Sequence, residues 1–205
     1  MKNLFPVFFI VFLISCSTIK KDDYVKEIEE YQFEENLKFH DASKSPLTKE
    51  DLKTFKKLEF YPIDKKYRVL AQIEKTVNAP IFEMTTTTSR KPLYIKYGTL
   101  TFTLDGIEQN IPVYQNKDID RDPQYIDNLF IPFTDKTSGE GSYGGGRYID
   151  VLTTDEKPDG TIIVDFNKAY NPYCAYSDRY SCPLTPKENT LSVAIPAGVK
   201  AYKKH

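Results

Sequence analysis

The chain has 205 residues, with 28 basic and 29 acidic side chains and a formal net charge of −1. Basic residues form no block, so the composition gives no support to a nucleic-acid partner. Aromatic residues are abundant, with 15 Tyr and 13 Phe but no Trp, which is typical of a β-rich domain with half-buried sheet faces.

The first 15 residues have the parts of a secretion signal. Lys2 supplies a positive charge, and an unbroken apolar run covers residues 4–14. This run is shorter than the ~20 residues that cross a membrane as a helix, which favours a signal peptide over a permanent span. It ends in Leu13-Ile14-Ser15-Cys16, which resembles the lipobox of bacterial lipoproteins. The resemblance implies cleavage after Ser15 and lipidation of Cys16, and an ordinary secreted protein is the alternative.

A lipidated Cys16 would anchor the chain stably to a membrane. We therefore expect a protein of the cell envelope, with the outer membrane as its expected location. Residues 16–22 are expected to form a tether. Lys20-Lys21-Asp22-Asp23 resembles a charged signal that exports some lipoproteins to the cell surface, although a short charged run also suits a solvated linker. Residues 23–205 are enough for a single domain.

Two helices are expected before the β-rich part. The apolar residues of segment 24–39 recur at helical spacing, which predicts an amphipathic helix whose apolar stripe comprises Tyr24, Ile28, Tyr31, Leu37 and Phe39. Thr48 is placed as the N-cap of a second, short helix through Lys57, with acidic residues in its first turn.

After Lys57 the apolar residues alternate, which is typical of strands. The expected strands cover residues 67–73, 81–87, 93–104, 107–114, 129–133, 147–152, 161–166 and 190–195. Asp105-Gly106 lies between two alternating runs and predicts a type I′ hairpin turn. The pattern predicts a mainly β fold, an antiparallel barrel or sandwich of about eight strands with one or two N-terminal helices.

A glycine-rich segment between Asp135 and Tyr148 is the densest candidate for chemistry. It matches G-x-G-x-x-G literally, but an alternating strand pattern follows it instead of a helix, so the dinucleotide reading fails. The P-loop and nucleophile-elbow patterns fail as well. We expect Gly144, Gly145 and Gly146 to form a nest that binds an anion together with Arg147. A tight loop with Arg147 in a salt bridge is the alternative.

A second group of polar side chains follows the expected strand 161–166. It consists of Asp165, Asn167, Tyr170 and Asn171. These side chains could orient a ligand, or they could satisfy the backbone of a long irregular loop.

Cys174 and Cys182 are the thiols that remain once Cys16 is lipidated. The cell envelope permits disulfides, and a bond between these two residues would stabilise the fold by about 2.5 kcal/mol in a chain-entropy account. A structural disulfide or two buried free thiols are expected ahead of metal or redox chemistry.

Histidine chemistry has few candidates, because His40 and the C-terminal His205 are the two histidines of the sequence. A Ser-His-Asp triad or a histidine-rich zinc site would have to use His40. Neither a metal site nor a cofactor is predicted. Any catalysis is expected to rest on carboxylates, Tyr, Arg or Cys.

Several strings occur in a familiar order between residues 45 and 202. They include Phe60-Tyr61-Pro62, Tyr143-Gly144-Gly145-Gly146-Arg147-Tyr148, Asp165-Phe166-Asn167-Lys168-Ala169-Tyr170-Asn171-Pro172 and Cys182-Pro183-Leu184. Together they resemble the domain-of-unknown-function family numbered 1684. Val199 departs from that family's pattern, which has an acid at this position. The family carries no established activity, so the resemblance implies a shared site without naming its chemistry.

Three functions follow as expectations. The first is a lipid-anchored envelope protein that binds a small polar or anionic ligand through Arg147, the glycine nest and the polar residues after Asp165. The second is a hydrolase or transferase with Asp135 or Asp165 as general base and Arg147 as electrostatic stabiliser. The third is a structural or interaction lipoprotein, which an exposed apolar patch and no pocket would indicate.

Overall fold

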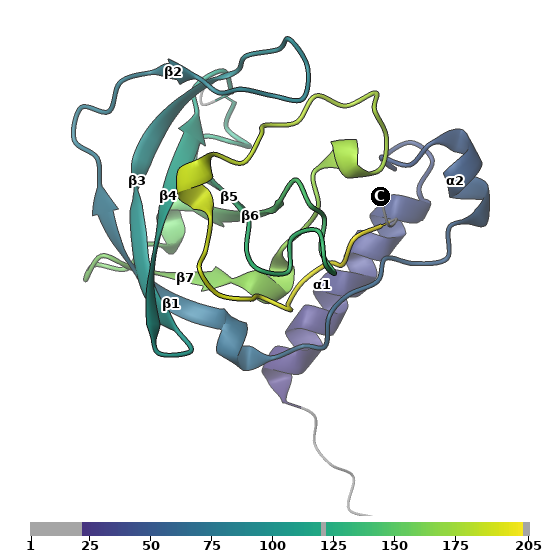
Figure 1. The fold of residues 1–205 in the computed structure, drawn as a ribbon, viewed down its shortest axis with the longest axis horizontal. Helices are drawn as coiled ribbons and strands as arrows, with labels where there is room; N and C mark the ends of the chain where they lie inside the picture. Colours follow the sequence, from purple (N-terminus) through teal and green to yellow (C-terminus); the bar gives the residue numbers. More distant parts are fainter. Residues whose placement is uncertain (1–21, 120–121, 203–205) are drawn as a thin grey trace, which may run out of the picture.

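Antiparallel strands dominate the computed structural model, which describes residues 22–119 and 122–202 (Figure 1). The predicted signal peptide, the lipidation site Cys16 and residues 16–21 of the tether lie outside this part. The seven strands are β1 (Arg68–Lys75), β2 (Phe82–Glu83), β3 (Leu93–Leu104), β4 (Ile107–Asn116), β5 (Asn128–Phe133), β6 (Arg147–Leu152) and β7 (Thr161–Asp165).

These strands form one sheet in the order β6-β5-β4-β3-β1-β7, with β2 paired to β3. The sheet curls into a half-barrel, so the predicted mainly β class is confirmed. Asp105 and Gly106 both have positive φ, at 52° and 75°, as the predicted type I′ turn between β3 and β4 requires. Alternate side chains of the strands point into the half-barrel and fill it with an apolar core that includes Leu100, Ile131 and Val164.

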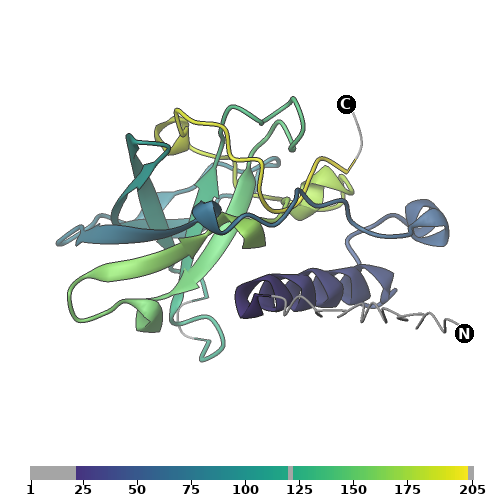
Figure 2. The same cartoon turned by 90° about the horizontal axis from the view of Figure 1, so that it is seen from below.

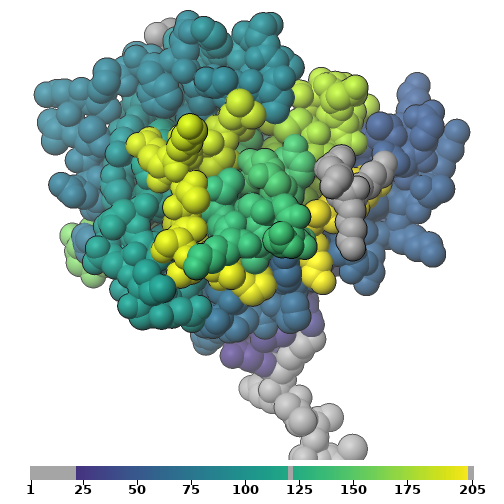
Figure 3. All heavy atoms as spheres, in the orientation of Figure 1, coloured from purple at the N-terminus to yellow at the C-terminus, as the bar shows by residue number. Residues whose placement is uncertain are grey.

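Residues 190–195, the eighth predicted strand, do not form a strand of the sheet. Their predicted alternation of buried and exposed side chains is nevertheless confirmed. Leu191, Val193 and Ile195 are buried in the core of the half-barrel, while the residues between them are exposed. The backbone bonds to the loop after β5 instead of to a sheet neighbour, for example through the Leu191 N–H and the Thr134 carbonyl at 2.8 Å. In Figure 3 the C-terminal part of the chain, in yellow, lies over teal and green parts of the surface.

The second predicted strand, residues 81–87, is also shorter than expected. Only Phe82 and Glu83 pair with β3, and the chain then turns toward the segment around Cys182. The N–H of Thr87 donates to the Cys182 carbonyl at 2.9 Å, so this backbone finds its partners outside the sheet.

Two helices precede the sheet, as predicted: α1 (Asp23–His40) and α2 (Lys49–Thr54). The Thr48 hydroxyl accepts from the Asp51 N–H at 3.0 Å, which confirms the predicted cap, although α2 stops three residues short of Lys57. α1 lies as a separate layer beside the strands (Figure 2). Within the described residues, neither helix combines the length and apolar character that a membrane span requires.

Candidate functional site

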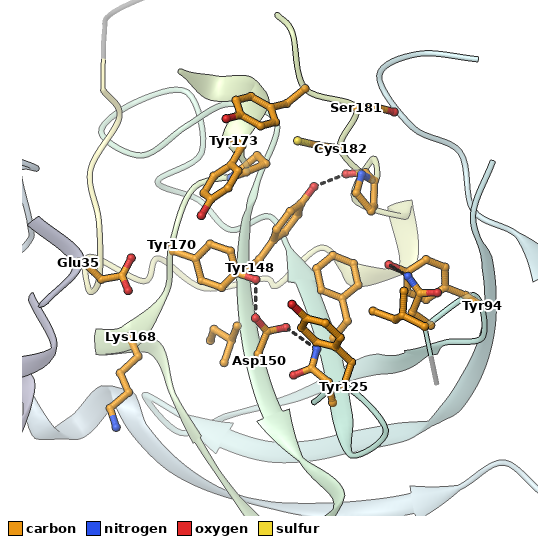
Figure 4. Close-up of a pocket in the computed structure, with 18 of the residues that line it drawn as sticks. Glu35, Tyr94, Tyr125, Tyr148, Asp150, Lys168, Tyr170, Tyr173, Ser181 and Cys182 are labelled. Atoms are coloured by element: carbon orange, nitrogen blue, oxygen red, sulfur yellow. Dashed lines mark hydrogen bonds between the residues drawn. The ribbon is translucent and has the colours of Figure 1, made fainter. Parts of the chain in front are cut away.

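A cavity of about 740 Å³ lies on the face of β5 and β6 that points away from the half-barrel core (Figure 4). Its other walls come from α1, the ends of β3 and β4 at Tyr94 and Asn116, the chain between β4 and β5, residues 168–173 and residues 180–183. Segments far apart in the sequence therefore meet around one space.

The alternation of β6 produces this arrangement. Arg147, Ile149 and Val151 point into the protein core, whereas Tyr148 belongs to a second apolar cluster on the opposite face. Asp150 follows two residues later on the same face as Tyr148, and both side chains line the cavity.

Aromatic residues account for eight of the twenty residues that line the cavity. Seven tyrosines and one phenylalanine line it: Tyr31, Tyr94, Tyr125, Phe130, Tyr148, Tyr170, Tyr173 and Tyr180. Phe130 and Tyr148 meet edge to face at 4.7 Å between ring centroids, and Tyr148 meets Tyr170 at 5.8 Å. Such packing holds the rings in fixed orientations.

Asp150 is the polar centre of the cavity. Its carboxylate accepts hydrogen bonds from the Tyr170 hydroxyl at 2.5 Å and from Asn128 Nδ2 at 3.3 Å. The surrounding walls displace part of the water around Asp150 and raise its pKa above the usual value, although these two hydrogen bonds counter part of the effect. The residue itself is exposed to solvent.

The tyrosine hydroxyls act as neutral hydrogen-bonding groups. Burial raises the pKa values of Tyr31, Tyr148 and Tyr170 well above the usual range. Each hydroxyl therefore keeps its proton and can donate it, as Tyr148 does to the Pro183 carbonyl and Tyr31 does to the Lys168 carbonyl.

Two ion pairs stand at the α1 side of the cavity. Lys38 Nζ lies 2.5 Å from Glu35 Oε1 within the helix, and Lys168 Nζ lies 2.7 Å from Glu27 Oε1. The second pair also ties α1 to the segment that follows β7.

Cys182 lines the cavity, and the Cys174 N–H donates to its sulfur at 3.1 Å. Both cysteines are free thiols in this structure. A hydrogen bond from the Cys174 thiol and nearby backbone N–H groups lower the pKa of Cys182 to about 7, while the same contact raises the pKa of Cys174. The two residues are thus adjacent, as a disulfide would require, and one of them has thiolate character near neutral pH.

Residues 53–200 match a family described as protein of unknown function, DUF1684. The chain belongs to this family. It is also similar to the solution NMR structure of an uncharacterized protein of Haloarcula marismortui, with 34% identity and a TM-score of 0.68 over 89% of this chain and 97% of that one. No curated protein matches the sequence.

In this DUF1684 protein, Arg147 does not form the predicted anion site. Its terminal nitrogens donate to Asp135 Oδ2 and to the Ile195 carbonyl, each at 2.8 Å, and to the Ala197 carbonyl. The side chains of Arg147 and Asp135 are both fully shielded from solvent. Burial lowers the pKa of Arg147, and the adjacent Asp135 carboxylate opposes that effect. The predicted alternative, a loop held by an Arg147 salt bridge, matches this geometry.

The glycines before Arg147 shape the entry into β6. Gly146 has a φ of 93°, and a side chain there would meet the Phe133 carbonyl at 2.6 Å, so only glycine fits beside β5. Gly144 and Gly145 are exposed on the loop, and neither lines the cavity. The three glycines therefore lie apart from the cavity.

Asp165 and Asn167 anchor α1 instead of facing the cavity. The Tyr24 hydroxyl donates to Asp165 at 3.0 Å, and Asn167 Nδ2 donates to the Tyr24 oxygen at 2.8 Å. Asn167 also bonds the Asp64 backbone in both directions. The predicted catalytic residues Asp135 and Asp165 thus both serve internal contacts, on different sides of the core.

Of the residues predicted to bind a ligand, Tyr170 is the one that lines the main cavity. Its neighbour Asn171 donates to the Lys200 carbonyl at 2.9 Å and to the Tyr176 hydroxyl at 3.2 Å, and it borders a small void behind the cavity. The described residues contain no cluster of three or more His, Cys, Asp or Glu side chains suited to a metal ion.

The sequence analysis missed Asp150, Asn128 and Tyr148. A signal was present, because β6 alternates between core residues and a Tyr-x-Asp pair, and β5 places Asn128 and Phe130 opposite its own core residues. When the second face of a strand carries aromatic and acidic side chains, another segment or a ligand is expected to cover that face.

Proposed function

We propose that this DUF1684 protein binds a small organic molecule in the cavity above β5 and β6. The observation that carries the proposal is a space of about 740 Å³ with aromatic walls and a few converging polar groups. Pockets of roughly 300–1,000 Å³ with this composition are typical small-molecule sites.

The side chains divide the work of recognition. Tyr148, Phe130 and Tyr173 offer ring surface to the apolar part of a ligand. Asp150 and Asn128 supply an acceptor and a donor that orient its polar part. In this proposal Asp150, and not the buried Arg147, recognises the polar part of the ligand. A structural or interaction lipoprotein fits less well, because that function predicts the absence of a pocket.

We further propose that residues 1–15 are removed as a signal peptide and that Cys16 is lipidated. Residues 16–22 would then tether a single domain, 23–205, to the outer membrane. The resemblance of Leu13-Ile14-Ser15-Cys16 to a lipobox supports this. Cells grown with an alkyne-bearing fatty acid should label the wild type and not Cys16→Ser. Labelling of that variant would contradict the anchor.

A thermal-shift screen with small molecules of the envelope tests the binding function. Hits should raise the melting temperature of the wild type and of Glu74→Gln, whose carboxylate is exposed on β1 far from the cavity lining. Asp150→Asn and Tyr148→Phe separate two roles: the first removes the charge, and the second keeps the ring but removes the bond to Pro183. Hits that stabilise all variants equally would show binding elsewhere.

A further inference from the structure

Asp150 differs from the other charged side chains of the cavity lining in having no ionic partner. Glu35 and Lys38 pair with each other, and Lys168 pairs with Glu27. The hydrogen-bond donors to Asp150 are the neutral groups of Tyr170 and Asn128. Within residues 22–119 and 122–202, no Lys or Arg forms an ion pair with Asp150. Among these described residues, the Asp150 carboxylate at the centre of the cavity therefore has no cation that balances its charge.

Aromatic rings surround this carboxylate. Figure 4 places Asp150 between Tyr170 and Tyr148 on one side and Tyr125 on the other. Ring faces attract cations electrostatically, and the attraction strengthens where water is excluded. A carboxylate with several tyrosine rings near it is thus complementary to a positive group with an apolar body.

We propose that the cavity selects an organic cation, a protonated amine or a quaternary ammonium group, because its unpaired Asp150 carboxylate stands among tyrosine rings. This inference rests on the proposed binding function and narrows it to one ligand class. The positive group lies beside Asp150, and the apolar remainder lies against Tyr148 and Phe130.

An anionic ligand is disfavoured by the same geometry. The two lysines of the lining stand at the α1 side, and each is already paired with a glutamate. An anion placed against the aromatic wall near Tyr148 would be repelled by the Asp150 carboxylate, and the described lysines of the lining are already paired.

Three probes of nearly equal size and shape test the selection: phenethylammonium, 2-phenylethanol and phenylacetate. Each is titrated into the purified, ¹⁵N-labelled protein at neutral pH, and Kd is obtained from the shifts of backbone resonances. Phenethylammonium is expected to bind roughly tenfold more tightly than 2-phenylethanol, with phenylacetate weakest. Benzyltrimethylammonium, which has no N–H donor, should keep much of the preference if ring faces contribute.

Variants identify the source of the preference. Asp150→Asn should reduce binding of phenethylammonium to the level of 2-phenylethanol and leave 2-phenylethanol itself unchanged. Glu74→Gln removes the same charge from an exposed site on β1 and should behave as the wild type. Asp150→Ala provides a second test, and the spectrum of each free variant reports whether it is folded.

The outcomes separate this inference from the binding function. Equal or tighter binding of 2-phenylethanol or phenylacetate at cavity residues would overturn the cation preference while supporting a binding cavity. A preference for phenethylammonium that survives in both Asp150 variants would overturn the role of the carboxylate. If none of the probes shifts cavity resonances, the cation inference is wrong, and the broader screen alone decides the binding function.

Discussion

Arg147 and Asp135 form an ion pair of 2.8 Å whose two side chains are completely withdrawn from solvent. The pair sits where β5 ends and β6 begins, and Arg147 also reaches the Ile195 and Ala197 carbonyls of the C-terminal segment. Asp135 accepts from the Ile195 N–H at 3.1 Å as well. One buried pair thus holds the glycine loop and the C-terminal segment against the open side of the half-barrel.

Breaking this pair should destabilise the fold strongly. Arg147→Met leaves Asp135 and two carbonyls without their charged donor, and we expect a loss of about 3–5 kcal/mol in the free energy of unfolding. Urea denaturation followed by circular dichroism measures it, with Glu74→Gln as the exposed control. A loss below about 1 kcal/mol, the range of surface pairs, would contradict the structural role.

The contact of Tyr24 with Asp165 should stabilise the packing of α1 against the segment at the end of β7. Tyr24→Phe removes the hydroxyl between Asp165 and Asn167 and should cost about 1 kcal/mol of stability. Because Tyr31, Glu35 and Lys38 of α1 line the cavity, ligand affinity should fall as well. Hydrogen exchange of residues 23–40 should be faster in the variant. Unchanged exchange there would show that other contacts hold α1.

The charge on Asp150 should lower the free energy of unfolding in a pH-dependent way. Its pKa is raised in the folded protein, so the cost of its charge is absent at acidic pH and appears as pH rises through that pKa. The groups that bond its carboxylate are the neutral Tyr170 hydroxyl and the neutral Asn128 amide. Asp150→Asn should therefore be more stable than the wild type at pH 7 by less than about 1 kcal/mol, since Asp150 retains solvent contact.

Unfolding curves at pH 3 and pH 7 check this sign. The two proteins should have matching stability at pH 3 and differ at pH 7. A variant less stable than the wild type at pH 7 would mean that the charged carboxylate stabilises the fold. In Tyr170→Phe, which lacks one hydrogen bond to the carboxylate, carbon-13 NMR should show a still higher pKa for Asp150.

Cys182 should react faster than Cys174 near neutral pH. Its pKa of about 7 predicts a rate of alkylation by iodoacetamide that rises through that pH, because the thiolate is the nucleophile. Peptide mass spectrometry separates the two sites. With diamide as oxidant, the two thiols should lose two hydrogens and form one intramolecular disulfide. Faster alkylation of Cys174 would contradict the direction of the hydrogen bond between them.

Local patterns in the sequence predicted much of the sheet and little of the site. The bounds of β3 and β6 agree with the alternation, and Asp105-Gly106 adopts its expected turn. Segment 190–195 shows the limit, because alternation reports one buried face and not the presence of a hydrogen-bonded neighbour.

The interaction partners of Arg147 could not be predicted from its neighbours in the sequence. Its partners are Asp135 and carbonyls about fifty positions later, which only the folded chain brings together. The cavity has the same origin, since α1, β5 and β6 each contribute one wall. Glycine and asparagine are typical of irregular backbone, and in this protein the irregular segments stabilise the fold.

The most direct test of the binding site is chemical-shift mapping of the most stabilising molecule from the screen. We expect the largest backbone shifts at Asn128, Asp150 and Tyr170, with little change at Asp135 or Asp165. Shifts confined to the glycine loop around Arg147, or to the contact of Asp165 with α1, would contradict it.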